Sequence, residues 1–253
     1  MRALDRVTAI LEAVSSSGSG ASLTEIAERT GLSLPTASRL VRDLAEQDLL
    51  QRADGARQYR IGARLLAIAS AASGRNPVIE IAVSPMVQLR DQTHETVSLH
   101  MQVGDRRVCI AEVQSTNEVR RVVPVGLSLP LHYGATGEVL LAFLPEVASD
   151  GYIATLDLEV APSRKLGNRL RAIRERGWAM ASESWSKGVA GIATSVRSPD
   201  GTVYALSVSG PSSRLTQEVM SGLVDTLQAA GQAISAALGA ALPTIPVTGG
   251  TAA

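Results

Sequence analysis

The chain has 253 residues, of which 45% are apolar and 19% are charged, and its formal net charge is zero. This composition excludes a disordered chain and allows one large domain or two smaller ones with a real core. A zero net charge gives no molecule-wide basic field for nucleic acid, and only 3% of the residues are aromatic. A stacking surface for single-stranded nucleic acid is therefore not expected.

The single cysteine, Cys109, rules out an internal disulfide and fits a reducing compartment. The start of the chain is not a signal peptide, because Asp5, Arg6 and Glu12 interrupt its apolar residues. No run reaches the roughly 18 apolar residues of a membrane span. We expect a cytoplasmic protein with no membrane partner.

The first 60 or so residues predict a winged helix-turn-helix. Apolar residues at helical spacing predict a helix over 4–14. Ser22 and Glu25 form a capping-box pattern, which predicts a second helix that Gly31 ends. A third helix is expected from about Ser33, followed by two short strands in 49–61 with Asp-Gly at their turn.

The remainder predicts an α+β domain built from antiparallel hairpins, with helices on one or both faces of a sheet. Strands are expected over 97–103 and up to 113, and again on both sides of Asp200-Gly201, while 120–131 looks extended. The expected helices are 62–74, 78 to about 92 with a kink or break at Pro85, 136–144, 163–176 and a single closing helix from 215 to 238. Leu215, Val219, Leu223 and Leu227 mark the apolar stripe of the closing helix.

These patterns predict four segments. Residues 1–61 form the winged helix-turn-helix and 62–77 a helical linker. Residues 78–242 form the second domain, and 243–253 a disordered tail.

The outward face of the third helix is a candidate DNA-reading surface. Arginines pair with guanine or phosphate, and short hydroxyl side chains reach phosphates or base edges. The candidate DNA-binding residues are Ser33, Thr36, Ser38, Arg39 and Arg42 on the helix, with Arg52 and Arg57 on the wing. The simpler alternative is a solvated surface helix, since the helix-turn-helix shape also occurs in proteins that bind no DNA. Charge favours the first interpretation only locally: 33–42 contains two arginines and no acid.

Several motifs resemble the IclR (isocitrate lyase regulator) family of bacterial transcriptional regulators. In the first domain they are "LTEIA", "TGL", "TASRL" and "YRIG", at 23–27, 30–32, 36–40 and 59–62. In the second domain they are "LSLPLHYGATGEVLLAFLP", "IRERGWAMASESWSKGVAGIATSV" and "ALSVSGPSSRLT". The resemblance covers essentially 1–242 and is far more specific than a lone helix-turn-helix.

The resemblance implies that the second domain is GAF-like and binds a small-molecule effector, often a carboxylic or aromatic acid. It also implies a homodimer or homotetramer on double-stranded operator DNA. The candidate effector-binding residues are Ala135, Thr136 and Gly137 at a helix N-terminus, Ser207 and Ser209 on one strand face, and Gly191, where the family commonly has a cysteine. The alternatives are a plain loop at the glycines and serines that face solvent.

Glu138 departs from the family pattern, which usually has a lysine at this position. A carboxylate that faces the pocket would disfavour an anionic effector. On that condition, we expect a bulkier, neutral or lactone-like ligand.

No catalytic motif is present, and neither an enzyme activity nor a cofactor is expected. His94, His100 and His132 could join Cys109 in a zinc site, but no C-x-x-C spacing supports it, and surface or packed histidines are the simpler interpretation. Cys109 fits a buried small apolar residue better than a nucleophile.

The sequence therefore predicts a ligand-responsive DNA-binding regulator, a repressor of a catabolic or secondary-metabolic operon. Helices 1–14 and 62–74 are the candidates for dimer contacts. The alternative is a small-molecule sensor or enzyme on a GAF-like scaffold that does not bind DNA specifically.

Overall fold

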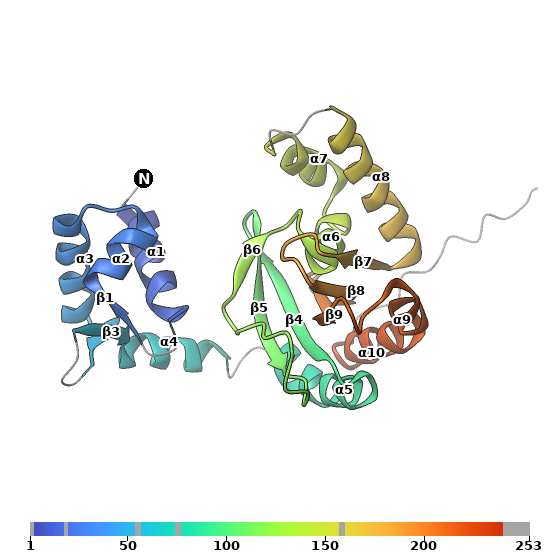
Figure 1. Ribbon diagram of the computed structural model, residues 1–253, viewed down its shortest axis with the longest axis horizontal. Coiled ribbons are helices and arrows are strands. Elements are labelled where there is room, and N and C mark those ends of the chain that lie inside the picture. Colours follow the sequence, from blue (N-terminus) through green and yellow to red (C-terminus); the bar gives the residue numbers. More distant parts are fainter. Residues whose placement is uncertain (1–2, 18–19, 54–56, 74–76, 157–159, 240–253) are drawn as a thin grey trace, which may run out of the picture. The chain divides into compact units, whose positions relative to one another are not determined.

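The computed structural model describes residues 3–17, 20–53, 57–73, 77–156 and 160–239 (Figure 1). The chain divides into two compact units, 1–76 and 77–253. The expected Asp-Gly turn of the wing and the expected disordered tail lie outside the described residues.

The first unit is a winged helix-turn-helix, as predicted. Its helices are α1 (Ala3–Ser15), α2 (Leu23–Thr30), α3 (Leu34–Glu46) and α4 (Ala63–Ser73). Its strands β1 (Ala21–Ser22), β2 (Leu50–Arg52) and β3 (Gln58–Ile61) form an antiparallel sheet in the order β1-β3-β2. Ile10, Ile26, Val41 and Leu50 meet in its core.

The helix signals of this unit are confirmed. Ser22 and Glu25 form the full capping box at the start of α2, and Gly31 ends that helix in the left-handed region with φ of 66°. Pro35 lies in the first turn of α3, where its missing N–H has no partner to lose. The short strand β1 was not predicted.

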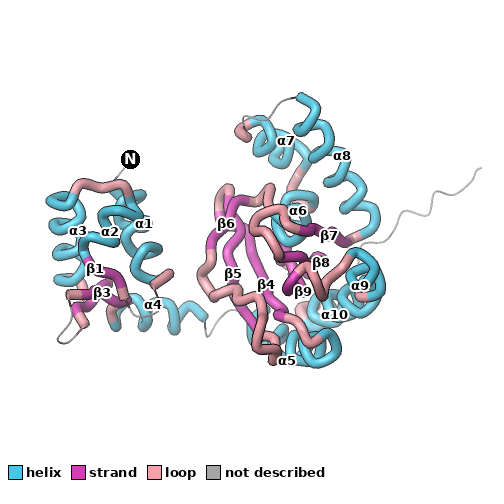
Figure 2. Tube along the Cα trace, in the orientation of Figure 1, coloured by secondary structure: helices cyan, strands magenta, loops and turns pink. Residues whose placement is uncertain are grey.

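The second unit is built on a six-stranded antiparallel sheet (Figure 2). The strand order is β6-β5-β4-β9-β8-β7. The strands are β4 (Thr96–Val103), β5 (Arg106–Val113), β6 (Ser128–Pro130), β7 (Trp178–Ser182), β8 (Val189–Arg197) and β9 (Val203–Pro211). The helices are α5 (Pro77–Thr93), α6 (Gly134–Ala142), α7 (Glu146–Ala154), α8 (Val160–Arg176), α9 (Gln217–Gly222) and α10 (Val224–Ala237).

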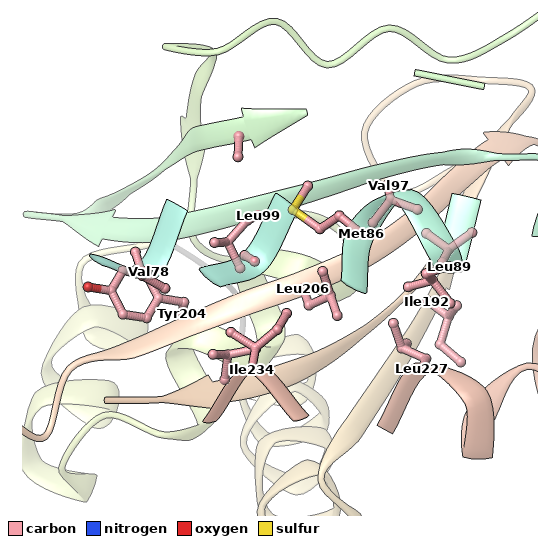
Figure 3. Packing of buried hydrophobic residues seen from close by; sticks show 14 of the residues in the cluster. Val78, Met86, Leu89, Val97, Leu99, Ile192, Tyr204, Leu206, Leu227 and Ile234 are labelled. Carbon is pink, nitrogen blue, oxygen red and sulfur yellow. The ribbon is translucent and has the colours of Figure 1, made fainter. Parts of the chain in front are cut away.

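Helices cover both faces of this sheet. Helices α5 and α10 pack on one face, where Met86, Leu206 and Ile234 belong to one buried cluster (Figure 3). Helices α6 and α8 contribute Leu140 and Leu170 to a second buried cluster. Because side chains alternate along a strand, neighbouring residues of β9 supply the two clusters.

Helix α5 continues through Pro85 without a break, so of the two alternatives expected there the interruption is absent. One element prediction for this unit was wrong. The predicted closing helix is two helices, α9 and α10, and Val219 of its expected apolar stripe is exposed, whereas Met220 is buried. Of the stretch 120–131 only β6 is a strand. Helix α7 and strand β7 were not predicted.

Candidate functional site

The exposed face of α3 carries the predicted DNA-reading residues. Ala37, Val41 and Leu44 anchor the opposite face in the core, so the rest of the helix points outward. Arg39 and Arg42 are exposed, and neither forms a hydrogen bond or ion pair with any other described residue.

The hydroxyls of this face lie at the start of α3. Ser33 is the N-cap residue, but its side chain makes no capping hydrogen bond. Its Oγ lies 2.8 Å from Oγ1 of Thr36 instead, and Thr36 and Ser38 are half-buried. The N-terminal half of α3 therefore presents hydroxyl and guanidinium groups together, without a carboxylate between them.

The wing adds two more exposed guanidinium groups. Arg52 lies at the end of β2, and Arg57 lies directly before β3. These positions border residues 54–56, which are outside the described part of the chain.

A cavity of about 70 Å³ lies in the second unit between the sheet and the N-terminus of α6. Five of the predicted effector residues line it: Ala135, Thr136, Gly191, Ser207 and Ser209. Strand pairing explains how the sheet residues come together, since Ser209 is the partner of both Gly191 and Thr96, and Ser207 is the partner of Ser98.

Gly137, the sixth predicted residue, does not line the cavity. A Cβ atom at this position would lie 2.2 Å from the carbonyl oxygen of Leu131, so the glycine is needed for close packing. With Tyr133 as N-cap, Gly137 is also the fourth helical residue, and its N–H belongs to the hydrogen-bond ladder of the helix itself. We therefore leave Gly137 out of the candidate site.

Further polar residues that were not predicted to bind an effector also line the cavity, and they include Ser98, His100, Arg107, Arg121, Ser184 and Ser186. The alternating pattern at 96–102 places Ser98 and His100 on the same polar side of the strand, which was a sequence signal for a shared site. The structure buries both side chains. Arg107 shares its face of β5 with buried Cys109 and Ala111, which is an unusual place for an arginine.

Buried hydrogen bonds connect these side chains across three strands. Nη1 of Arg107 lies 3.4 Å from Nδ1 of His100, and Nε2 of His100 lies 2.9 Å from Oγ of Ser98. A guanidinium only donates, so Nδ1 accepts and Nε2 carries the proton. The hydroxyls of Ser98 and Ser207 are 3.0 Å apart.

Burial changes the charge balance in the cavity. It lowers the pKa of His100 well below 6.5, with the charges of Arg107 and Arg121 acting in the same direction. Burial and then Arg121 lower the pKa of Arg107 to about 10. At neutral pH, His100 is therefore uncharged and Arg107 is cationic.

Glu138 does not face the cavity. It is buried against α8, where Arg169 binds it with Nη2 at 2.8 Å from Oε1. The condition for expecting a neutral or lactone-like ligand is therefore not met, since no lining residue among the described ones is acidic.

Cys109 is buried, and desolvation raises the pKa of its thiol to about 12, which leaves no thiolate for nucleophilic chemistry at neutral pH. Within the described ranges, no three His, Cys, Asp or Glu side chains gather where they could hold a metal ion. His132 instead pairs with the hydroxyl of Tyr152 at 2.8 Å. In the same ranges, no helix is both long and apolar enough to cross a membrane.

Two family models match the chain. The model described as "IclR helix-turn-helix domain" matches residues 3–54, and "Bacterial transcriptional regulator IclR C-terminal" matches residues 70–236. The "HTH-type transcriptional repressor AllR" of Salmonella typhimurium and that of Escherichia coli K12 are each 29% identical over 245 residues, covering 94% of this chain and 90% of the relative.

Solved structures show the same fold over nearly the whole chain. The IclR of Thermotoga maritima is 27% identical, with a TM-score of 0.68, and the match covers 93% of this chain and 98% of that one. An IclR homolog of Microbacterium hydrocarbonoxydans, complexed with 4-hydroxybenzoate, is 24% identical, with a TM-score of 0.76 and coverage of 94% and 99%.

Proposed function

Because the chain belongs to the IclR family of bacterial transcriptional regulators, we propose that it represses transcription by placing α3 in the major groove of operator DNA. The protein is a ligand-responsive DNA-binding regulator. The repressed genes would form a catabolic or secondary-metabolic operon, and no catalytic step is assigned to the chain.

The observation that carries the DNA-binding proposal is the face of α3. Arg39 and Arg42 are exposed, and no acid lies within 33–42 to neutralise them. In the proposed complex, they contact guanine or phosphate, while Ser33, Thr36 and Ser38 contact the backbone or base edges. Arg52 and Arg57 of the wing contact the backbone or the minor groove.

A homodimer is proposed because one winged helix contacts too few base pairs to specify an operator. Helices α1 and α4 remain the candidates for its contacts. Leu4 of α1 and Leu66 and Ile68 of α4 are large apolar side chains that stay 78%, 57% and 55% exposed. We propose these strongly exposed apolar side chains as contacts with a second copy of the chain.

The effector would bind in the cavity of the second unit. The AllR relatives are repressors, and the Microbacterium hydrocarbonoxydans relative was solved with 4-hydroxybenzoate. An effector changes operator affinity only if it binds one conformational state of the protein better than another. We propose Ala135, Thr136, Gly191, Ser207 and Ser209 as residues that contact it.

A gel-shift titration tests the DNA-binding proposal. The full chain is titrated against the DNA upstream of its own gene and against an unrelated fragment of equal length. Arg39→Ala should abolish the preference for the upstream fragment. Arg164→Ala, which removes an exposed arginine of α8 in the other unit, should leave binding unchanged. Unaltered specific binding by Arg39→Ala would show that α3 does not read the operator.

A further inference from the structure

We propose that Leu34 recognises a thymine of the operator by packing against the C5-methyl group of that base in the major groove. The proposal rests on the proposed function, because it takes α3 to lie in that groove. It adds an apolar specificity-determining residue to the polar and charged contacts, and it names one base that each half-site of the operator must contain. Sequence patterns had not singled out Leu34.

Leu34 is an exposed leucine outside the core of the first unit. Its exposed fraction is 49%. Among the described residues, it belongs neither to the buried cluster of this unit nor to the apolar side chains packed against that cluster, whereas Leu32 and Leu40 on either side of it do pack there. One exposed leucine is ordinary in itself, so its place on the helix decides what it means.

That place is the first residue of α3, directly after the N-cap residue Ser33. In a helix-turn-helix, the N-terminal residues of the second helix contact the base edges. Leu34, Ser38 and Arg42 are spaced by four residues and therefore follow one side of α3. Leu34 thus lies at the N-terminal end of a row whose other two members are proposed to contact DNA.

The residue after Leu34 extends the apolar surface. Pro35 is the second helical residue, is exposed, and has no N–H group to donate. The first turn of α3 contains no acidic residue that would repel phosphates, and Arg39 and Arg42 are exposed further along the helix. These charges favour DNA as the partner of this surface over a second copy of the chain, whose formal net charge is zero.

The chemistry of the major groove selects the base. Thymine is the base that presents an apolar group there, its C5-methyl, whereas cytosine presents an N4 amino donor at the corresponding edge. A leucine side chain can neither donate nor accept a hydrogen bond, so cytosine opposite Leu34 would lose water from its amino group without a replacement. Thymine gains apolar contact at the same position and loses no hydrogen bond to water from its methyl group.

The test uses the DNA upstream of the chain's own gene in two forms, one with thymine and one with uracil at every thymine position. Uracil pairs in the same way and lacks only the methyl group. In fluorescence anisotropy, the wild type should bind the thymine form more tightly by about 4-fold for each contacted methyl, and by about 15-fold for a dimer on two half-sites. Leu34→Ala should bind both forms equally, and Leu34→Met, which keeps the apolar side chain, should still favour the thymine form.

Two controls separate base recognition from other effects. Val147→Ala truncates a side chain that is 87% exposed in the first turn of α7, in the other unit, and should discriminate between the two forms as the wild type does. Binding to unrelated DNA is chiefly electrostatic, so Leu34→Ala should bind it with wild-type affinity.

Thermal unfolding and sedimentation without DNA exclude a structural role. Because Leu34 is outside the core, Leu34→Ala should unfold at the wild-type temperature and keep the wild-type oligomeric state. A variant that loses the wild-type assembly would place Leu34 in a contact between subunits and would overturn the inference.

The inference is also overturned if the wild type binds the two forms equally, or if Leu34→Ala discriminates between them as the wild type does. Either result leaves the proposed function standing when the wild type still prefers the upstream fragment to unrelated DNA. If that preference is itself absent, the proposed function is contradicted, and the assignment of Leu34 to operator thymine is contradicted with it.

Discussion

At the scale of single residues, His100 makes the stability of the second unit depend on pH. Its pKa in the folded chain is well below 6.5, chiefly because it is buried, whereas the unfolded chain takes up the proton near 6.5. The unfolded state therefore binds more protons below that pH. The contribution of His100 to the free energy of unfolding should fall by up to about 1.4 kcal/mol per pH unit as the pH is lowered.

Urea denaturation between pH 7.5 and pH 5 measures this effect. His100→Gln is the comparison, since glutamine keeps an acceptor for Arg107 and a donor for Ser98 but does not titrate in this range. The pKa of Arg107, about 10, keeps that residue charged throughout. The wild type should lose more stability than the variant on acidification, and parallel losses would show that His100 is not held neutral by the fold.

At the scale of elements, two helical glycines with opposite surroundings should respond oppositely to alanine. A Cβ atom at Gly137 of α6 would meet the backbone of Leu131, which cannot move without shifting α6. Gly167 of α8 has nothing within 4 Å of the same position. Gly137→Ala should destabilise the second unit by about 1–3 kcal/mol, and Gly167→Ala should stabilise it by about 0.5–1 kcal/mol.

Chemical denaturation of the two variants under identical conditions provides the comparison. Because both changes replace a helical glycine by alanine, the intrinsic helix propensity is matched and the difference reports the space at each site. Equal effects of the two changes would contradict the close packing of α6 on Leu131.

Elements with local sequence signals were predicted well, and those defined by distant contacts were not. The capping box at Ser22 and the glycine at position 31 set the bounds of α2 within the helix itself. In contrast, β1 has two residues and exists because it pairs with β3, nearly 40 residues later in the chain. The interruption between α9 and α10 did carry a local signal, since Gly222 is the last residue of α9, but the prediction of one closing helix did not use it.

The residues of the candidate cavity also divide into those with a local sequence signal and those brought together by distant contacts. Its helix N-terminus and the serines of β9 were identified from a family pattern, but Arg107 was not, because an arginine beside a turn is ordinarily solvated. Only the sheet order, which puts β5 next to β4 and β4 next to β9, brings Arg107, His100 and Ser207 to one place. Local sequence patterns likewise could not predict that the side chain of Glu138 points to Arg169 and not into the cavity.

At the scale of the whole molecule, the zero net charge makes DNA binding depend on where the arginines lie. A phosphate contact by Arg57 releases a counterion from any DNA sequence. Arg57→Ala should therefore weaken binding to operator and unrelated DNA about equally and reduce the slope of log K against log[salt] by about 1. Fluorescence anisotropy at several salt concentrations measures the slope, and an unchanged slope would remove Arg57 from the interface.

The proposed function depends above all on the reading of the operator by α3. The most direct measurement is the Kd of the full chain and of Arg42→Ala for the DNA upstream of its own gene and for unrelated DNA of equal length. The wild type should prefer the upstream DNA by about 10³-fold or more, and Arg42→Ala should lose about 5- to 150-fold of that preference. Equal Kd values of the wild type for the two DNAs, or an unchanged preference in Arg42→Ala, would contradict the reading of the operator by α3.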